Sequence, residues 1–108
     1  MHWLKACDVQ DIDVGEVRQI KNGDYFIALY HIEDGFYATQ DACTHAVASL
    51  ADGYVEDGMI ECPLHAGKFC IKTGRAKSLP VSVGLKTYSV RVEGSDVYIG
   101  IEEAKEAV

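Results

Sequence analysis

Positively charged residues, prolines and long apolar runs are all scarce in this sequence. Lysine and arginine number 10 against 17 aspartates and glutamates, which gives a formal net charge of −7. Because binding to nucleic acid requires a positive surface, this balance argues against a nucleic-acid partner. The same charge is compatible with docking onto basic patches of partner proteins, and equally with a role in solubility alone.

The lack of long apolar runs bears on location. The longest clear run, Tyr25–Tyr30, is far shorter than the roughly 18 residues that a membrane-spanning helix needs. The first residues, MHWLKACD, contain no apolar core of a secretory signal. We therefore expect a soluble, cytoplasmic protein without a membrane partner. In a reducing compartment, the four cysteines indicate metal or redox chemistry rather than disulfides.

No repeat, low-complexity tract or linker divides the chain. Its 108 residues, of which 48% are hydrophobic and 25% charged, fit one folded domain spanning 1–108. Short runs of alternating and β-branched residues are separated by turn signals, several of them Asp-Gly pairs that favour tight hairpins. This pattern predicts an all-β fold, a small sandwich or barrel. Strands are expected at 16–20, 25–32, 36–39, 54–56, 59–61, 86–92 and 97–99, with a frayed tail over 102–108.

Two short segments could carry chemistry. The first is Cys43-Thr44-His45 and the second is Cys62-Pro63-Leu64-His65, with sixteen residues between His45 and Cys62. The hairpin around Asp57-Gly58 lies between them and would bring the two segments side by side. Two thiolates and two imidazoles could hold a zinc ion tetrahedrally, or a two-iron cluster in which histidines replace two cysteines.

At these residues the chain resembles the Rieske family, whose signature is C-x-H followed, after a spacer of this length, by C-x-x-H. The flanking residues are similar to those of Rieske ferredoxins from bacterial aromatic-ring-hydroxylating dioxygenase systems, and the resemblance covers nearly the whole chain. It is carried by the stretches DACTH at 41–45, DGY at 52–54, IECPLH at 60–65, GKF at 67–69, TG at 73–74 and LKTY at 85–88.

The resemblance implies one [2Fe–2S] cluster per chain, in a cluster-binding part at approximately 40–80 made of two hairpin-like loops. Cys43 and Cys62 would hold one iron as thiolates, and His45 and His65 the other through imidazole nitrogens. Because imidazole is neutral where thiolate is anionic, such a cluster accepts an electron more readily than an all-cysteine cluster. The resemblance also places the histidine edge at the surface, where electrons would enter and leave.

Respiratory Rieske proteins carry two further cysteines that join the ligand loops, and the corresponding positions here are Ala48 and Leu64. They also have a serine and a tyrosine that donate hydrogen bonds to sulfur, where this chain has Gly67 and Phe69. Such hydrogen bonds stabilise the reduced cluster and raise its potential. The sequence therefore predicts a potential at the low end of the Rieske range, about −150 mV.

Four other features of the sequence bear on the cluster region. Cys7 and Cys70 lie outside the ligand set, and we expect both side chains to be free, largely buried thiols. Leu79-Pro80 resembles the proline-containing loop that covers the cluster in the family. Ala46 replaces the glycine that commonly follows the first ligand histidine, which we expect to affect loop shape or partner fit.

The chain offers no place for substrate chemistry. His2 and His31 are the only other histidines, they lie far apart, and no G-x-G-x-x-G segment binds a flavin or nicotinamide. His31 is interpreted as an ordinary strand histidine. The expected role is a monomeric carrier that moves one electron from a flavin-dependent NADH reductase to a terminal aromatic-ring dioxygenase, rather than an enzyme. A Rieske-like small subunit of a larger reductase, such as a nitrite reductase, and a zinc-stapled structural module are the alternatives.

Overall fold

The computed structural model describes residues 2–44, 47–64, 66–79 and 81–106, with only the backbone described from 102 onward. These residues form nine β-strands and two 3-10 helices of three residues each. Within the described ranges no helix could span a membrane. In chain order the elements are β1 (Trp3–Asp8), η1 (Val9–Asp11), β2 (Glu16–Asn22), β3 (Tyr25–Ile32), β4 (Gly35–Gln40), η2 (Leu50–Asp52), β5 (Tyr54–Glu56), β6 (Met59–Glu61), β7 (Lys68–Cys70), β8 (Lys86–Glu93) and β9 (Asp96–Glu106).

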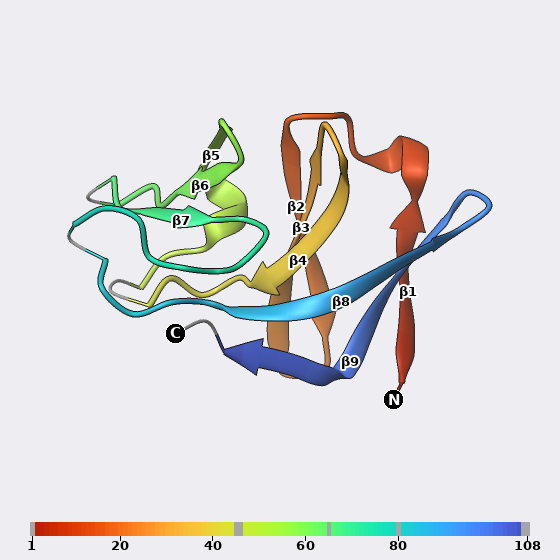
Figure 1. Ribbon diagram of the computed structural model, residues 1–108. Helices are drawn as coiled ribbons and strands as arrows, with labels where there is room; N and C mark the ends of the chain where they lie inside the picture. Colours follow the sequence, from red (N-terminus) through yellow and green to blue (C-terminus); the bar gives the residue numbers. More distant parts are fainter. Residues whose placement is uncertain (1, 45–46, 65, 80, 107–108) are drawn as a thin grey trace.

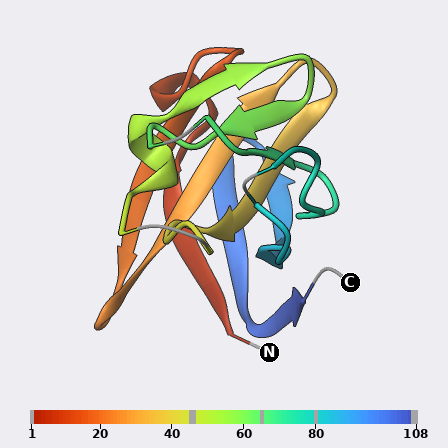
Figure 2. The same cartoon turned by 90° about the vertical axis from the view of Figure 1, so that its left-hand side faces the viewer.

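The strands form two antiparallel sheets. The larger has the order β1-β9-β8-β4-β3-β2 and the smaller the order β5-β6-β7. The larger sheet curls into a half-barrel, and the small sheet lies at one side of it, beyond the end of β4 (Figures 1 and 2). This arrangement confirms the predicted all-β class, with a smaller subdomain inserted between β4 and β8.

Strand β3 separates two apolar cores. Ile27 and Leu29 point into the curled sheet, where they pack in a cluster with residues of β1, β4 and β9. Ala28 and Tyr30 alternate with them and point to the opposite face, into a cluster shared with the small sheet. Side chains alternate between the two faces of a strand, so an apolar run buried on both sides joins two layers. Burial of each large aliphatic side chain contributes about 1.5–3 kcal/mol.

The predicted hairpins are present. Asp57 and Gly58 connect β5 to β6 with φ angles of 54° and 76°, the positive values that a two-residue hairpin turn requires. Glu93 pairs with Asp96 across another two-residue turn. His31 lies in β3 as expected, where its Nδ1 is 2.6 Å from the carbonyl oxygen of Ile12.

Three sequence expectations differ from the structure. Strands β1 and β7 were not expected, and the predicted frayed tail is wrong as far as Glu106. The end of β9 instead pairs with the beginning of β8, where Lys86 faces Glu106 across a register shift. Backbone pairing with the preceding strand orders this segment, although its local composition contains no strand signal.

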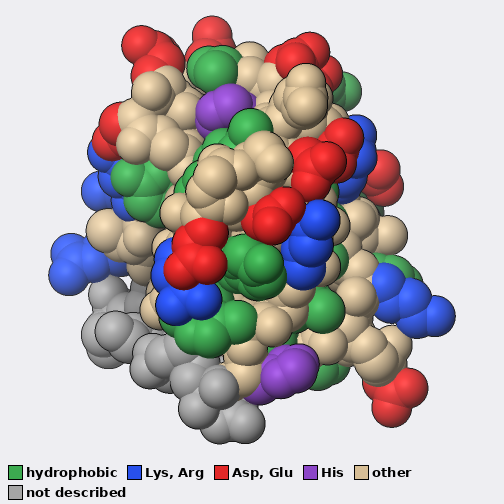
Figure 3. All heavy atoms as spheres, turned by 90° about the vertical axis from the view of Figure 1, so that its right-hand side faces the viewer, with side chains coloured by type: hydrophobic (Ala, Val, Ile, Leu, Met, Phe, Trp, Pro, Cys, Tyr) green, Lys and Arg blue, Asp and Glu red, His purple; other side chains and the backbone are tan. Residues whose placement is uncertain are grey.

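The face formed around β1 and the β8–β9 hairpin is a mixed charged surface (Figure 3). Lys5 lies 3.1 Å from Asp96, and Arg91 lies 3.2 Å from Glu93. The Arg91 guanidinium also lies over the ring of Trp3, 4.6 Å from its centroid. Acidic and basic side chains therefore compensate one another locally on this side of the molecule.

Candidate metal centre

Two loops adjoin at the open end of the small sheet. The first joins β4 to η2 and contains Cys43, and the second joins β6 to β7 and contains Cys62. The Cys43 N–H donates to the Ala48 carbonyl (3.1 Å), and the Cys62 N–H donates to the Gly67 carbonyl (2.8 Å). Each loop is therefore closed at its base by the backbone of its own cysteine.

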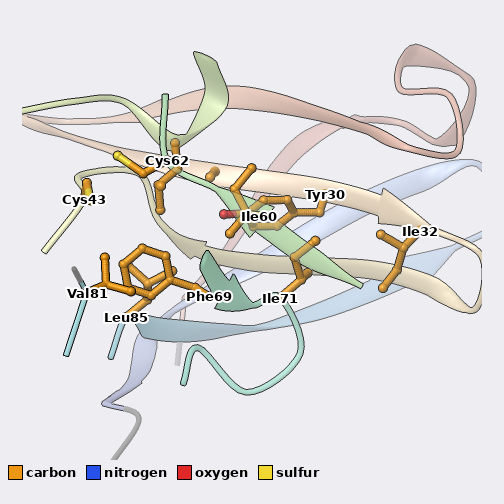
Figure 4. Packing of buried hydrophobic residues seen from close by; sticks show 11 residues of the cluster. Tyr30, Ile32, Cys43, Ile60, Cys62, Phe69, Ile71, Val81 and Leu85 are labelled. Atoms are coloured by element: carbon orange, nitrogen blue, oxygen red, sulfur yellow. The ribbon is translucent and has the colours of Figure 1, made fainter. Parts of the chain in front are cut away.

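The two cysteines meet from these adjoining loops (Figure 4). They belong to one apolar cluster and are 8% and 1% exposed. Burial raises the pKa of the Cys62 thiol, the Leu64 backbone N–H lowers it, and a hydrogen bond with Cys43 raises it further. Metal binding requires thiolates, so it must displace the proton that burial favours.

The structure brings together the two sulfur donors that the sequence predicted. The two predicted nitrogen donors, His45 and His65, lie outside the described residues, as do Ala46 and Pro80. In sequence each histidine belongs to the same loop as one cysteine, which is the donor distribution that a four-ligand centre between two loops needs.

The described residues 77–79 and 81–83, called the wall below, lie beside the two loops. Val81 is buried in the same cluster as both cysteines. A Cβ atom built on Gly67 would lie 2.5 Å from Val81 Cγ1, so this segment and the second loop are in direct contact. The Thr44 hydroxyl donates to the Val83 carbonyl at 2.7 Å, which fastens the first loop to the same segment. Leu79, in the predicted covering loop, has a side chain that is 86% exposed, and the covering role stays a prediction.

No disulfide is present among the four cysteines, all of which are described. The positions expected to lack an inter-loop bridge, Ala48 and Leu64, line the two loops. Cys7 and Cys70 are both of intermediate exposure, on strands β1 and β7. Cys7 packs against the cluster inside the curled sheet.

Sequence reasoning missed the polar residues that hold the first loop. Asp41 is 4% exposed and its carboxylate accepts three hydrogen bonds. Thr44 provides the bond to Val83. The sequence shows that Asp41 and Thr44 are polar and lie close to Cys43, but it does not show their partners. Ser49 lies eight positions from Asp41, and Val83 lies 39 positions from Thr44.

The fold and the paired cysteines fit a small all-β metalloprotein whose centre has sulfur ligands from two loops. The model of the Rieske [2Fe-2S] domain family matches residues 2–89, and the chain belongs to that family. The family match selects one [2Fe–2S] cluster per chain over the zinc ion that the ligand pattern left open. The two buried sulfurs fit the thiolate half of such a centre.

The chain is similar to ferredoxin subunits along its whole length. It is 46% identical over 106 residues to the 3-phenylpropionate/cinnamic acid dioxygenase ferredoxin subunit of Shigella boydii, covering 97% of this chain and 99% of the relative. The corresponding subunit of Escherichia coli K12 is 45% identical with the same coverage.

Solved structures agree. A chain from the complex of oxygenase and ferredoxin in carbazole 1,9a-dioxygenase superposes with a TM-score of 0.89 at 37% identity, covering 98% of this chain and 96% of that one. The Sphingomonas yanoikuyae B1 ferredoxin gives 0.85 at 36% identity, covering 91% and 97%. A structure described as a putative nitrite reductase small subunit gives 0.80 at 26% identity, covering 93% and 99%.

Proposed function

We propose that this chain is the electron-carrying ferredoxin of an aromatic-ring dioxygenase system, with Cys43, His45, Cys62 and His65 as the ligands of its cluster. The observation that carries the proposal is the meeting of two buried cysteines from two loops that each contain a histidine in sequence. The cysteines would hold one iron and the histidines the other. When bound, the cluster supplies reversible one-electron chemistry.

The residues around the ligands suit brief contacts with a partner. Exposed aliphatic side chains come from the first loop, the second loop and the wall: Val47, Leu64, Leu79 and Val83. Exposed apolar side chains that gather in one region of a soluble protein are typical of an interaction site. The net charge of −7 favours encounter with a basic partner surface.

The partners proposed are a flavin-dependent NADH reductase and a terminal oxygenase. Support comes from the relatives: the similar chains are ferredoxin subunits of dioxygenases, and one similar structure contains ferredoxin in complex with its oxygenase. A carrier that must leave both partners needs no permanent subunit contact, so we propose a cytoplasmic monomer. Residues 1–108 would form one domain, with approximately 40–80 binding the cluster.

Reconstitution tests the carrier role. A purified reductase and a terminal oxygenase of this class are mixed with NADH and an aromatic substrate. Hydroxylation is expected only when this chain is added. Equal turnover without the chain would contradict the proposal.

The ligand set has its own test. Replacing His45 or His65 by alanine is expected to abolish the visible absorption of the cluster, whereas His31→Ala, on strand β3, is expected to leave it unchanged. Retention of colour and one-electron reduction in either ligand variant would contradict the assignment.

A second candidate is the small subunit of a nitrite reductase, favoured by the 26% identity to a structure described in those terms. That role predicts stable co-purification with a large reductase subunit. The higher identity to dioxygenase ferredoxins over the whole chain favours the first proposal.

A further inference from the structure

Asp41 is a buried carboxylate at the base of the first ligand loop, two positions before Cys43. Its side chain is outside the ligand set, yet it is 4% exposed. It follows the last residue of β4, and its own backbone is tied on both sides. Its N–H donates to the Phe26 carbonyl (3.2 Å), and its carbonyl accepts from the Leu50 N–H (2.8 Å).

The carboxylate accepts three hydrogen bonds. Oδ2 accepts from Nε2 of Gln19 at 2.8 Å and from the Ser49 hydroxyl at 2.6 Å. Oδ1 accepts from the Ala51 backbone N–H at 2.9 Å. Bonds to an ionisable carboxylate are stronger than neutral ones, and a buried carboxylate needs such partners.

These donors lie at the far end of the loop, just beyond it, or on another strand. Ser49 is the last residue of the loop and Ala51 belongs to η2, whereas Gln19 belongs to β2, at the edge of the large sheet. The carboxylate therefore joins the beginning of the loop to its end and fixes both to the sheet. Further into the loop, the Cys43 N–H donates to the Ala48 carbonyl, and this second bond closes the loop around the residues between them.

We propose that Asp41 is a positioning residue for the metal centre, which holds the base of the first loop closed and thereby fixes the orientation of Cys43 toward the cluster. The inference rests on the ligand set proposed above, and adds a residue that acts through Cys43. An aspartate suits this position because its carboxylate accepts from all three groups, whereas an asparagine would turn an N–H toward one of them.

Four variants separate this role from general effects of charge and folding. Asp41→Asn removes one acceptor, and Ser49→Ala removes one donor without changing the charge. Ser49→Thr keeps the hydroxyl and is the conservative control. Asp52→Asn, at an exposed carboxylate in η2, removes the same charge outside the hydrogen-bond network.

The measurements use the cluster-containing protein. Asp41→Asn and Ser49→Ala are expected to broaden and shift the electron paramagnetic resonance signal of the reduced protein, because Cys43 samples several orientations. They are also expected to lose visible colour to a chelator about five-fold faster, the factor corresponding to the net contribution of one hydrogen bond. Ser49→Thr and Asp52→Asn are expected to match the unsubstituted protein in both measurements.

Unchanged resonance line shape and unchanged cluster loss in Asp41→Asn would overturn the inference. If that variant does not fold, the same unchanged result in Ser49→Ala overturns it. A signal without mixed histidine–cysteine character in the unsubstituted protein would contradict the ligand set and this inference with it. A normal signal combined with no support of hydroxylation would contradict only the carrier role.

Discussion

The hydroxyl of Thr44 donates to the backbone carbonyl of Val83 across 2.7 Å, joining residues 39 positions apart. Thr44 lies between two proposed ligands, and Val83 belongs to the wall that packs on the second loop. In a chain without a disulfide between its ligand loops, this bond and the contact of Gly67 with Val81 connect the loops through a shared neighbour.

Loss of the Thr44 hydroxyl is expected to weaken this connection. Thr44→Val should destabilise the cluster-containing protein by about 1 kcal/mol, the net value of one such hydrogen bond, and lower the midpoint of thermal bleaching of the visible absorption. Thr44→Ser retains the donor and should behave as the unsubstituted protein. Equal midpoints for the valine and serine variants would show that the bond contributes nothing to the centre.

A side chain at Gly67 is expected to be costly. In Gly67→Ala the new methyl group would lie 2.5 Å from Val81 Cγ1, so the wall must shift, and denaturant unfolding should report a loss of about 1–3 kcal/mol. Val81→Ala removes the opposing methyl groups. The double variant should therefore recover about 1 kcal/mol relative to the sum of the single variants; strict additivity would contradict the proposed clash.

The reduction potential is expected to lie near −150 mV, the low end of the Rieske range. Phe69 is fully buried in the same cluster as Cys43 and Cys62 and has no hydroxyl to donate to sulfur. Phe69→Tyr should raise the potential by about 40 mV, equivalent to about 1 kcal/mol for one electron. Phe69→Leu is the control without a hydroxyl, and a similar rise there would remove the hydrogen-bond explanation.

The two cysteines outside the ligand set are expected to react differently with alkylating agents. Burial raises the pKa of the Cys70 thiol, but hydrogen bonds from the Thr73 hydroxyl and neighbouring backbone N–H groups outweigh this and leave the pKa below its usual range. Burial and nearby Asp11 raise the pKa of Cys7.

Because the thiolate is the reactive form, and a lowered pKa gives more thiolate at a given pH, Cys70 should be alkylated before Cys7 in a neutral-to-alkaline series. Peptide mass spectrometry on the cluster-containing protein measures both rates. Thr73→Val removes one stabilising hydrogen bond and should move the Cys70 profile to higher pH; faster reaction of Cys7 throughout would contradict the order.

Partner docking is expected to depend on the aliphatic side chains around the ligand loops. Leu79→Glu places a charge on one of them and should lower the rate of electron delivery to the oxygenase about ten-fold, as for a central interface residue. Val92→Glu is the matched control, because Val92 is exposed on the distant β8–β9 hairpin (Figure 1). Equal rates for the two variants would place the docking surface elsewhere.

Much of the fold followed from local pattern. Runs such as Tyr25–Ile32 and turns such as Asp57-Gly58 specify strands and hairpins through side-chain periodicity and positive φ, which neighbours in sequence determine. Strand β1 was not predicted, because the strand that it pairs with, β9, lies at the other end of the chain. Strand β7 has only three residues, and unlike the equally short β5 and β6 it does not flank an Asp-Gly turn.

The sequence by itself determined the ligand spacing, the hairpin that brings Cys43 and Cys62 together, and the family. Only the tertiary structure decided which groups hold the loops: the donors around Asp41, the carbonyl that receives Thr44, and the methyl group that requires glycine at position 67. Ligand spacing is a property of nearby residues, whereas these contacts join segments whose proximity arises when the two sheets pack.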